Sequence, residues 1–339
     1  FWLKSLRPPL PPERRWAFGA RSMAPKKNPK KGEGENDLWD DFIKKYNKMQ
    51  KEFDTPPIHN VKEIIRMMEE GEEVKKWSFD REFDAMAFRV LWNSLRAANY
   101  VDIDAIWVWK SSGKDESVRS VCGYLEMEPP PNVKDLQFTD NGVTELGCEF
   151  LGRLLGPEGN KVVNKLMLDY NQFGTPGVQK LSAGLSQNCT LRHLSLNYCA
   201  IGEDGGQYIA HILMFVRNAL EILDLRGNYL KDRGIVDVFN GAKRTKNLSR
   251  IDVFDNKFAD TPEVIKALRD LFANNTSLVY YDLAGNQISD AGASMLVNGM
   301  IGKEHLQAVK VTERCSNKTF EALEFQLSAG KGKKGKKRK

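Results

Sequence analysis

The chain has 339 residues, enough for one large domain or two small ones, and its formal net charge is +6. Nine basic and three acidic residues lie in 1–35 and seven basic residues in 331–339, which leaves −7 for residues 36–330. A mildly acidic body does not fit a folded nucleic-acid-binding domain. No run of about 18 apolar residues occurs, so no membrane-spanning helix is predicted.

Five cysteines, an odd number without a CxxC pair, indicate reduced thiols and a cytoplasmic protein. Residues 1–35 are expected to form a disordered basic arm. Met23 opens MAPKKNPKKGEGEN, which has the character of a natural start, so it stays open whether residues 1–22 belong to the natural protein. An arginine-rich transit peptide is the alternative, although four prolines disfavour the amphipathic helix it needs.

Residues 36–100 are expected to form a helical N-terminal segment, with helical patterns over 61–76 and 80–98. The strongest helical pattern runs from Asn36, the expected N-cap, to Phe53. Its apolar face carries Trp39, Phe42 and Tyr46. Either this face packs on the body of the protein, or it binds a groove in a partner protein.

Residues 101–328 contain a repeat, L-x-x-L-x-L-x-x-N. Its six clear copies are 28 to 30 residues apart and begin at Val133, Val163, Leu191, Leu220, Leu248 and Leu278. Two degraded copies, which begin at Ile103 and Leu306, lack the asparagine. Terminal units are expected to be atypical because they must cap an open core.

Within each copy the alternating apolar residues predict a short strand, and the asparagine predicts a turn whose backbone groups its amide satisfies. A helical pattern follows, so each unit is predicted to be strand, turn, helix and return loop. Stacked units would align the asparagines into a ladder, which consists of Asn141, Asn171, Asn228, Asn256 and Asn286. In one unit Cys199 replaces the asparagine. Residues 112–132 depart from the helical pattern and are predicted to be a projecting loop.

These copies resemble the leucine-rich repeats of the ribonuclease-inhibitor-like class, over roughly residues 100–327. The resemblance implies an α/β fold, a right-handed solenoid or horseshoe with a parallel sheet on its concave side and helices outside. Tyr281 at a core leucine position and Asp260-Thr261-Pro262 at the start of a helical segment depart from the family pattern. A fold of this kind does not imply one particular function.

No catalytic constellation appears in the sequence. The four histidines are scattered, and no nucleophile, zinc-protease or dinucleotide motif occurs. We therefore expect a protein that is not an enzyme and has no cofactor, metal or small-molecule substrate.

Binding is expected on the concave face, toward which the residues between core leucines point. Asp224, Asp252 and Asp282 share one strand position and would stack in a row. Neighbouring positions supply the other expected contact residues: Arg226, Arg250, Phe254, Tyr280, Tyr170 and Tyr198. The row is either an ordinary feature of the family or an acidic stripe that binds a protein partner.

Residues 329–339 are expected to be a disordered lysine-rich tail. Five of its basic side chains are the expected contacts: Lys333, Lys334, Lys336, Lys337 and Arg338. They either stay solvated, as in a nuclear-import-like tail, or contact a polyanion such as an acidic tubulin tail or RNA.

The favoured function is a non-enzymatic interaction scaffold in a large multi-subunit assembly. A resemblance to axonemal components, which combine such repeats with Lys/Gly-rich ends, favours the cytoskeleton of the ciliary axoneme. One alternative is an activator of a small GTPase, although activators of this repeat class typically carry an acidic C-terminal region. A mitochondrial or RNA-associated assembly component is a further alternative, and the acidic body disfavours a specific RNA surface.

Overall fold

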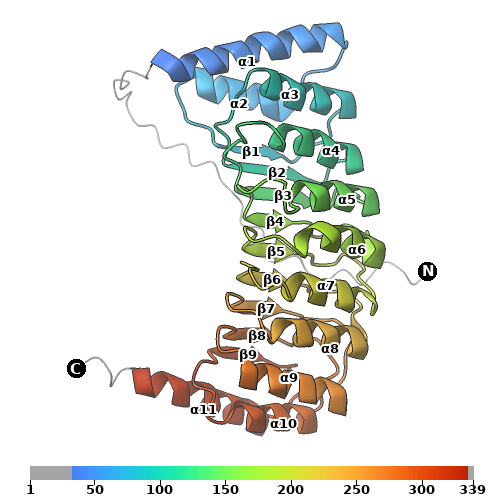
Figure 1. The fold of residues 1–339 in the computed structure, drawn as a ribbon, viewed down its shortest axis with the longest axis vertical. Helices are drawn as coiled ribbons and strands as arrows, with labels where there is room; N and C mark the ends of the chain where they lie inside the picture. The colour runs from blue at the N-terminus through green and yellow to red at the C-terminus, as the bar shows by residue number, and fades with distance from the viewer. Residues whose placement is uncertain (1–32, 335–339) are drawn as a thin grey trace.

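The computed structural model describes residues 33–334. Within them a parallel sheet of nine strands runs in chain order, with neighbours in sequence paired throughout. Figure 1 shows the strands stacked on one side of the molecule and the helices on the other. The strands are β1 (Lys76–Phe79), β2 (Ala105–Trp109), β3 (Asp135–Thr139), β4 (Lys165–Met167), β5 (His193–Ser195), β6 (Ile222–Asp224), β7 (Arg250–Asp252), β8 (Tyr280–Asp282) and β9 (Ala308–Lys310).

Each strand from β1 to β8 leads into a helix, and further helices lie at both ends of the stack. The helices are α1 (Glu33–Glu52), α2 (His59–Glu69), α3 (Ala85–Ala97), α4 (Lys114–Leu125), α5 (Glu145–Leu154), α6 (Gly174–Leu185), α7 (Gly205–Leu213), α8 (Lys231–Ala242), α9 (Pro262–Asn274), α10 (Asp290–Met300) and α11 (Asn317–Lys334). The expected α/β solenoid is therefore confirmed.

The sheet register explains the leucine spacing. Leu223 of β6 is paired with Leu194 on one side and Ile251 on the other, and all three side chains are buried. The same alignment runs along the sheet, so the apolar side chains of successive units form one continuous core between the sheet and the helices. Tyr281, the departure from the leucine pattern, is also fully buried and packs edge-on against Phe272.

The sheet begins one unit earlier than the repeat pattern indicates. The segment 36–100 was expected to be helical, but its residues Lys76–Phe79 form β1, which pairs with β2. Trp77 and Phe79 alternate with polar residues and are fully buried, which is the period of a strand. Large aromatic residues here replace the leucines, so this unit does not match the leucine pattern.

The first helix packs on the body of the protein. Phe42 and Tyr46 of α1 are buried, and Phe42 stacks on Tyr46 and meets Trp77 edge-on. Trp39 is partly buried against the same core. The alternative that this face packs on the body is therefore confirmed, and the alternative that it binds a partner is wrong, because the chain buries Phe42 and Tyr46. The helix begins at Glu33, so Asn36 is not its N-cap and residues 33–35 are not part of a disordered arm.

Residues 112–132 are not a loop. They contain α4, whose buried side chains Val118, Val121, Cys122 and Leu125 recur at helical spacing. At the other end of the chain, α11 runs to Lys334, so residues 329–334 continue a helix instead of belonging to a disordered tail. The remaining tail residues, and residues 1–32, lie outside the described part of the chain.

The predicted asparagine ladder is confirmed. Asn228 is fully buried, and its Nδ2 donates to the carbonyl oxygens of Leu196 (2.9 Å) and Leu225 (2.8 Å). The backbone N–H groups of Cys199 and Ile201 donate to its Oδ1. One side chain thus satisfies four backbone groups in two adjacent units. Where Cys199 replaces asparagine, its thiol donates to the carbonyl oxygen of Leu168 (3.2 Å).

A second set of buried asparagines, which the sequence analysis missed, lies in the loops that precede the strands. Asn188 donates to the carbonyl oxygen of Leu155 in the preceding unit, and its Oδ1 accepts from the backbone of Thr190 and Leu191. Asn160 and Asn275 make the same pattern of bonds. Both ends of β4, β5 and β8 are therefore hydrogen-bonded to the neighbouring unit.

Replacing Asn228 by alanine tests the ladder. The variant leaves buried backbone groups of two units without partners, so we expect the free energy of unfolding to fall by about 3 kcal/mol. Urea denaturation followed by circular dichroism measures the change. Asn240→Ala, at an exposed position of the adjacent helix α8, is the matched control and should change the stability by less than about 0.5 kcal/mol. Equal losses in both variants would contradict the role given to Asn228.

Candidate functional site

The candidate binding surface is the open sheet face, meaning the side of the sheet that the helices leave uncovered. On each strand the residues between buried core positions point to it, as expected for the concave side. Asp224, Asp252 and Asp282 lie opposite one another on β6, β7 and β8, as predicted. All three are nevertheless buried, with Asp252 and Asp282 each only 3% exposed. They do not form an accessible acidic stripe, and that prediction is wrong.

Basic side chains from neighbouring strands cover the aspartates. The guanidinium of Arg226 lies 3.0 Å from a carboxylate oxygen of Asp252 and 3.7 Å from one of Asp282. Arg250 lies 3.5 Å from Asp224, and Lys310 lies 3.3 Å from Asp282. The charges therefore neutralise one another within the sheet. Burial raises the pKa of the Asp252 carboxyl, while the backbone N–H of Phe254 and the Arg226 guanidinium oppose that rise.

The predicted aromatic contact residues near these aspartates lie over the same cations. The Arg226 guanidinium is 4.5 Å from the ring centroid of Phe254, and that of Arg250 is 5.0 Å from Tyr280. The ammonium of Lys310 also lies over the Tyr280 ring, 5.2 Å from its centroid. In these cation–π contacts the cations and the ring faces are occupied by each other, within the chain. The structure thus brings Arg226, Arg250, Phe254 and Tyr280 together, but as a cluster whose charges and rings contact one another, with Asp224 Oδ1 and Arg250 Nε left without a hydrogen bond among the described residues.

Tyr170 and Tyr198 form a separate pair in the turns after β4 and β5. Their rings stack with centroids 4.9 Å apart and planes at 9°. Both residues have positive φ, which the turn imposes in other units too, at Lys110, Asp140, Asp255 and the glycines Gly227 and Gly285. A side chain at Gly227 would collide with the Tyr198 ring. Tyr170 remains 45% exposed, so one face of this pair is open to a ligand.

The sequence analysis missed an aromatic pair on β2. Trp107 and Trp109 alternate with the buried Ile106 and Val108, so both point to the open sheet face, and Trp109 is 52% exposed. The ammonium of Lys76 lies 3.0 Å from the Trp107 ring centroid, and that of Lys110 lies 5.2 Å from the Trp109 ring. The alternation in AIWVW could have revealed this pair, because Ile103 had already been identified as the start of a degraded copy.

We call Trp107, Trp109, Tyr170 and Tyr198 the aromatic patch. It spans β2 to β5, in contrast to the charged cluster on β6 to β9. Lys165 of β4 lies 5.9 Å from the Trp107 ring and 3.0 Å from Asp135, so the patch carries basic side chains at its border. The indole Nε1 of Trp107 is buried and has no hydrogen-bond partner among the described residues. This half of the face therefore retains unsatisfied polar and apolar groups.

Other kinds of site are not found in residues 33–334. No group of three or more His, Cys, Asp or Glu side chains there could hold a metal ion. Within the same range no helix is both long and apolar enough to cross a membrane. Of the expected tail contacts, Lys333 and Lys334 belong to α11, and Lys336, Lys337 and Arg338 lie outside the described residues.

The charged cluster predicts a stability that depends on pH. Arg226→Met removes the cation beside Asp252, so the carboxyl pKa of Asp252, already raised by burial, rises further. A folded-state pKa above the unfolded value makes ionisation destabilising. The variant should therefore match the wild type near pH 4 and lose about 2 kcal/mol by about pH 8.

Thermal unfolding across this pH range measures the effect. Arg233→Met is the matched control, since it breaks an ion pair with Asp204 in which both side chains are exposed. It should cost less than about 1 kcal/mol at every pH. If Arg226→Met follows the pH profile of the control, Arg226 does not neutralise the buried aspartates.

Comparison with known proteins agrees with the repeat architecture. The family model described as "Leucine Rich repeat" matches residues 187–210 and 274–297. A human protein named "NACHT, LRR and PYD domains-containing protein 14" is 30% identical over 190 residues, which are 55% of this chain and 17% of that protein. The mouse ribonuclease inhibitor is 27% identical over 174 residues, 51% of this chain and 37% of the inhibitor.

The chain thus spans well under half the length of these relatives. Among solved structures, an internalin from Listeria monocytogenes aligns with 76% of this chain and 73% of its own, at 15% identity and a TM-score of 0.45. The repeat architecture is that of a protein-interaction scaffold. In its period and its parallel sheet with outer helices, the chain is similar to leucine-rich repeat proteins, and among its curated relatives to ribonuclease inhibitors.

Proposed function

We propose that this protein is a non-enzymatic scaffold that binds another protein through the aromatic patch of its open sheet face. The observation that carries the proposal is the pair of half-exposed rings, Trp109 and Tyr170, on a rigid parallel sheet. Exposed tryptophan and tyrosine side chains contribute large contact areas at little cost in conformational entropy and dominate the energetics of interfaces.

The stacked tyrosines support the same part of the face. The rings of Tyr170 and Tyr198 lie with their centroids 4.9 Å apart, and Tyr170 stays 45% exposed, so the pair presents apolar ring surface to a partner. The lysines at the border of the patch, Lys76 and Lys110, suit a partner segment that carries acidic groups between apolar ones.

We further propose that the partner belongs to a large cytoskeletal assembly, with the ciliary axoneme as the favoured site and a cytoplasmic location. Support for this finer proposal comes from the resemblance to axonemal components with such repeats and Lys/Gly-rich ends. The basic tail fits a second, weaker contact with a polyanion such as an acidic tubulin tail, since clustered lysines attract anionic surfaces over about one Debye length.

Site-specific photo-cross-linking tests both levels of the proposal. A photoreactive phenylalanine analogue replaces Trp109 in the full chain, and cross-linked peptides are identified by mass spectrometry in native cell extract at physiological salt. We expect links to one defined neighbour in a cytoskeletal complex, and Tyr170→Ala in the same chain should reduce them about tenfold.

The analogue placed at Tyr229, which is exposed to a similar extent, is the control and should give few links to that neighbour. Links from Trp109 mainly to a small GTPase would contradict the cytoskeletal assignment and leave the patch as the binding surface. No more links from Trp109 than from Tyr229 would contradict both.

A further inference from the structure

The loops that lead from each helix into the next strand form a continuous row along one edge of the sheet. They share this edge because parallel strands joined by outer helices re-enter the sheet from the same side. We call this row the loop edge. The loops used below precede successive strands: 70–75 before β1, 98–104 before β2, 126–134 before β3, 155–164 before β4, 186–192 before β5, 214–221 before β6 and 243–249 before β7.

The charge of the loop edge changes sign along its length. The loops before β1, β2 and β3 together carry −5, whereas the loop before β7 carries +3 from Lys243, Arg244 and Lys246. Part of this charge is paired within the chain, since Lys75 faces Glu73 and Asp102 and Lys243 faces Asp270.

Some charged side chains of the loops before β3 and β7 remain available. Glu128 on the acidic side, and Arg244 and Lys246 on the basic side, are exposed and have no ion pair among the described residues. Glu126 is also exposed, and its one ion pair, with Arg153, is a loose contact at 3.8 Å. Two separated patches of opposite sign therefore face solvent on the same edge.

An exposed apolar tip lies in the loop before β6. Val216 is 87% exposed and Met214 is 55% exposed, with Phe215 half-buried between them. Their exposure is unusual because the other helix-to-strand loops of the middle units present mostly polar residues. Apolar side chains held outward at a loop tip are a common anchor of protein interfaces.

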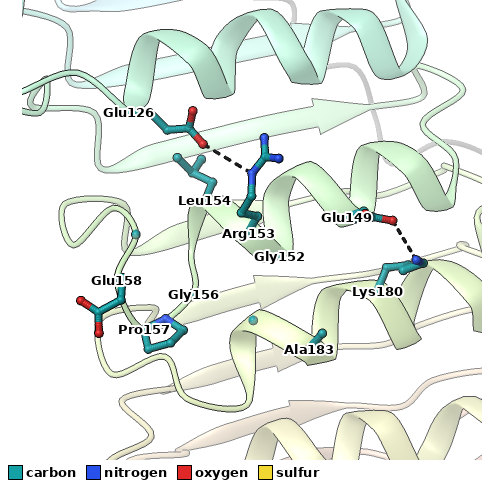
Figure 2. Close-up of a pocket in the computed structure, with 12 residues that line it drawn as sticks. Glu126, Glu149, Gly152, Arg153, Leu154, Gly156, Pro157, Glu158, Lys180 and Ala183 are labelled. Atoms are coloured by element: carbon teal, nitrogen blue, oxygen red, sulfur yellow. Dashed lines mark ion pairs between the residues drawn. The ribbon is translucent and has the colours of Figure 1, made fainter.

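A groove of about 600 Å³ lies beside the loop before β4. Figure 2 shows it between that loop, which carries Pro157, and the ends of α5 and α6, with the Glu126–Arg153 ion pair at its rim. Gly152 and Gly184 line it because α5 and α6 contact each other directly there, and a Cβ on Gly184 would lie 1.7 Å from the carbonyl oxygen of Gly152. Its apolar walls are backbone, Leu154, Pro157 and Ala183, and charged side chains also line it: Glu126, Glu149, Arg153, Glu158 and Lys180.

The tip and the groove are equally far from the loop before β5, one unit to either side. The basic loop before β7 and the acidic loop before β3 are two units to either side of it. A twofold axis through residues 186–192 therefore places the tip of one copy at the groove of the other, and each basic loop at an acidic loop. We propose that two copies of this chain associate antiparallel through their loop edges, with Val216 of each copy in the groove of the other.

The charge distribution selects this arrangement over a parallel one. Parallel association would put acidic loops against acidic loops and basic loops against basic loops, which repel. An isologous antiparallel pair uses each complementary contact twice, as twofold symmetry requires. The open sheet face takes no part in the contact, so both copies of the aromatic patch stay free.

Sedimentation velocity of the full chain tests the proposal. We expect a dimer at low ionic strength that weakens toward 1 M salt, where the Debye length is about 3 Å. Val216→Glu should raise the dissociation constant at least about tenfold. Phe325→Glu, at a similarly exposed position of α11 outside the loop edge, is the matched control and should leave it unchanged.

A charge exchange tests the pairing itself. R244E/K246E and E126K/E128K should each be monomeric alone, because each would put like charges in contact, and an equimolar mixture should recover the dimer. A short bismaleimide should join the two copies at Cys189, the exposed cysteine of the loop before β5, since the other four cysteines are buried. A chain that stays monomeric at low salt, a dimer unaffected by Val216→Glu, or a mixture that fails to recover would each overturn the proposal.

Discussion

The buried asparagine that closes the turn after each strand is the interaction on which the solenoid depends. Its amide lies between two units, where water does not reach, and it satisfies backbone groups of both. A buried backbone group without a partner costs more than an ordinary hydrogen bond contributes, so this side chain determines whether the stack forms. The second set of asparagines, Asn160, Asn188 and Asn275, applies the same constraint at the other end of β4, β5 and β8. Each unit is consequently stable only between neighbours.

The ends of such a stack have no neighbour and need a different solution. At the N-terminal end the aromatic side chains of α1, α3 and β1 replace the leucines and close the core with a cluster of rings. At the C-terminal end α11 lies against α10, and Leu323 completes the last core layer. The large rings fit the ends because a capping layer receives packing from one side only and must fill more volume with each residue.

Two halves of the open sheet face differ in how far their side chains are satisfied within the chain. On β6 to β9 the buried aspartates are paired with cations that lie over aromatic rings, so a partner would have to disrupt existing contacts to bind there, although Asp224 Oδ1 and Arg250 Nε lack hydrogen bonds among the described residues. On β2 to β5 the rings of Trp109 and Tyr170 stay half-exposed, and the indole of Trp107 lacks a hydrogen-bond partner among the described residues. A partner that covers the exposed faces of Trp109 and Tyr170 leaves the buried aspartate pairs undisturbed, which is why this half suits a partner better.

The sequence by itself determined the solenoid, because a strand period of two, a helical period and an asparagine recurring at nearly constant spacing are all local patterns. It did not reveal β1, since Trp77 and Phe79 fill leucine positions, or α4, whose apolar spacing was overlooked beside the prolines that follow it. Sequence alone placed Asp224, Asp252 and Asp282 in one row, but could not show that Arg226 and Arg250 reach across strands and bury them. Only the tertiary structure decided which residues of the face remain free, because accessibility depends on the side chains of adjacent units and not on the unit itself.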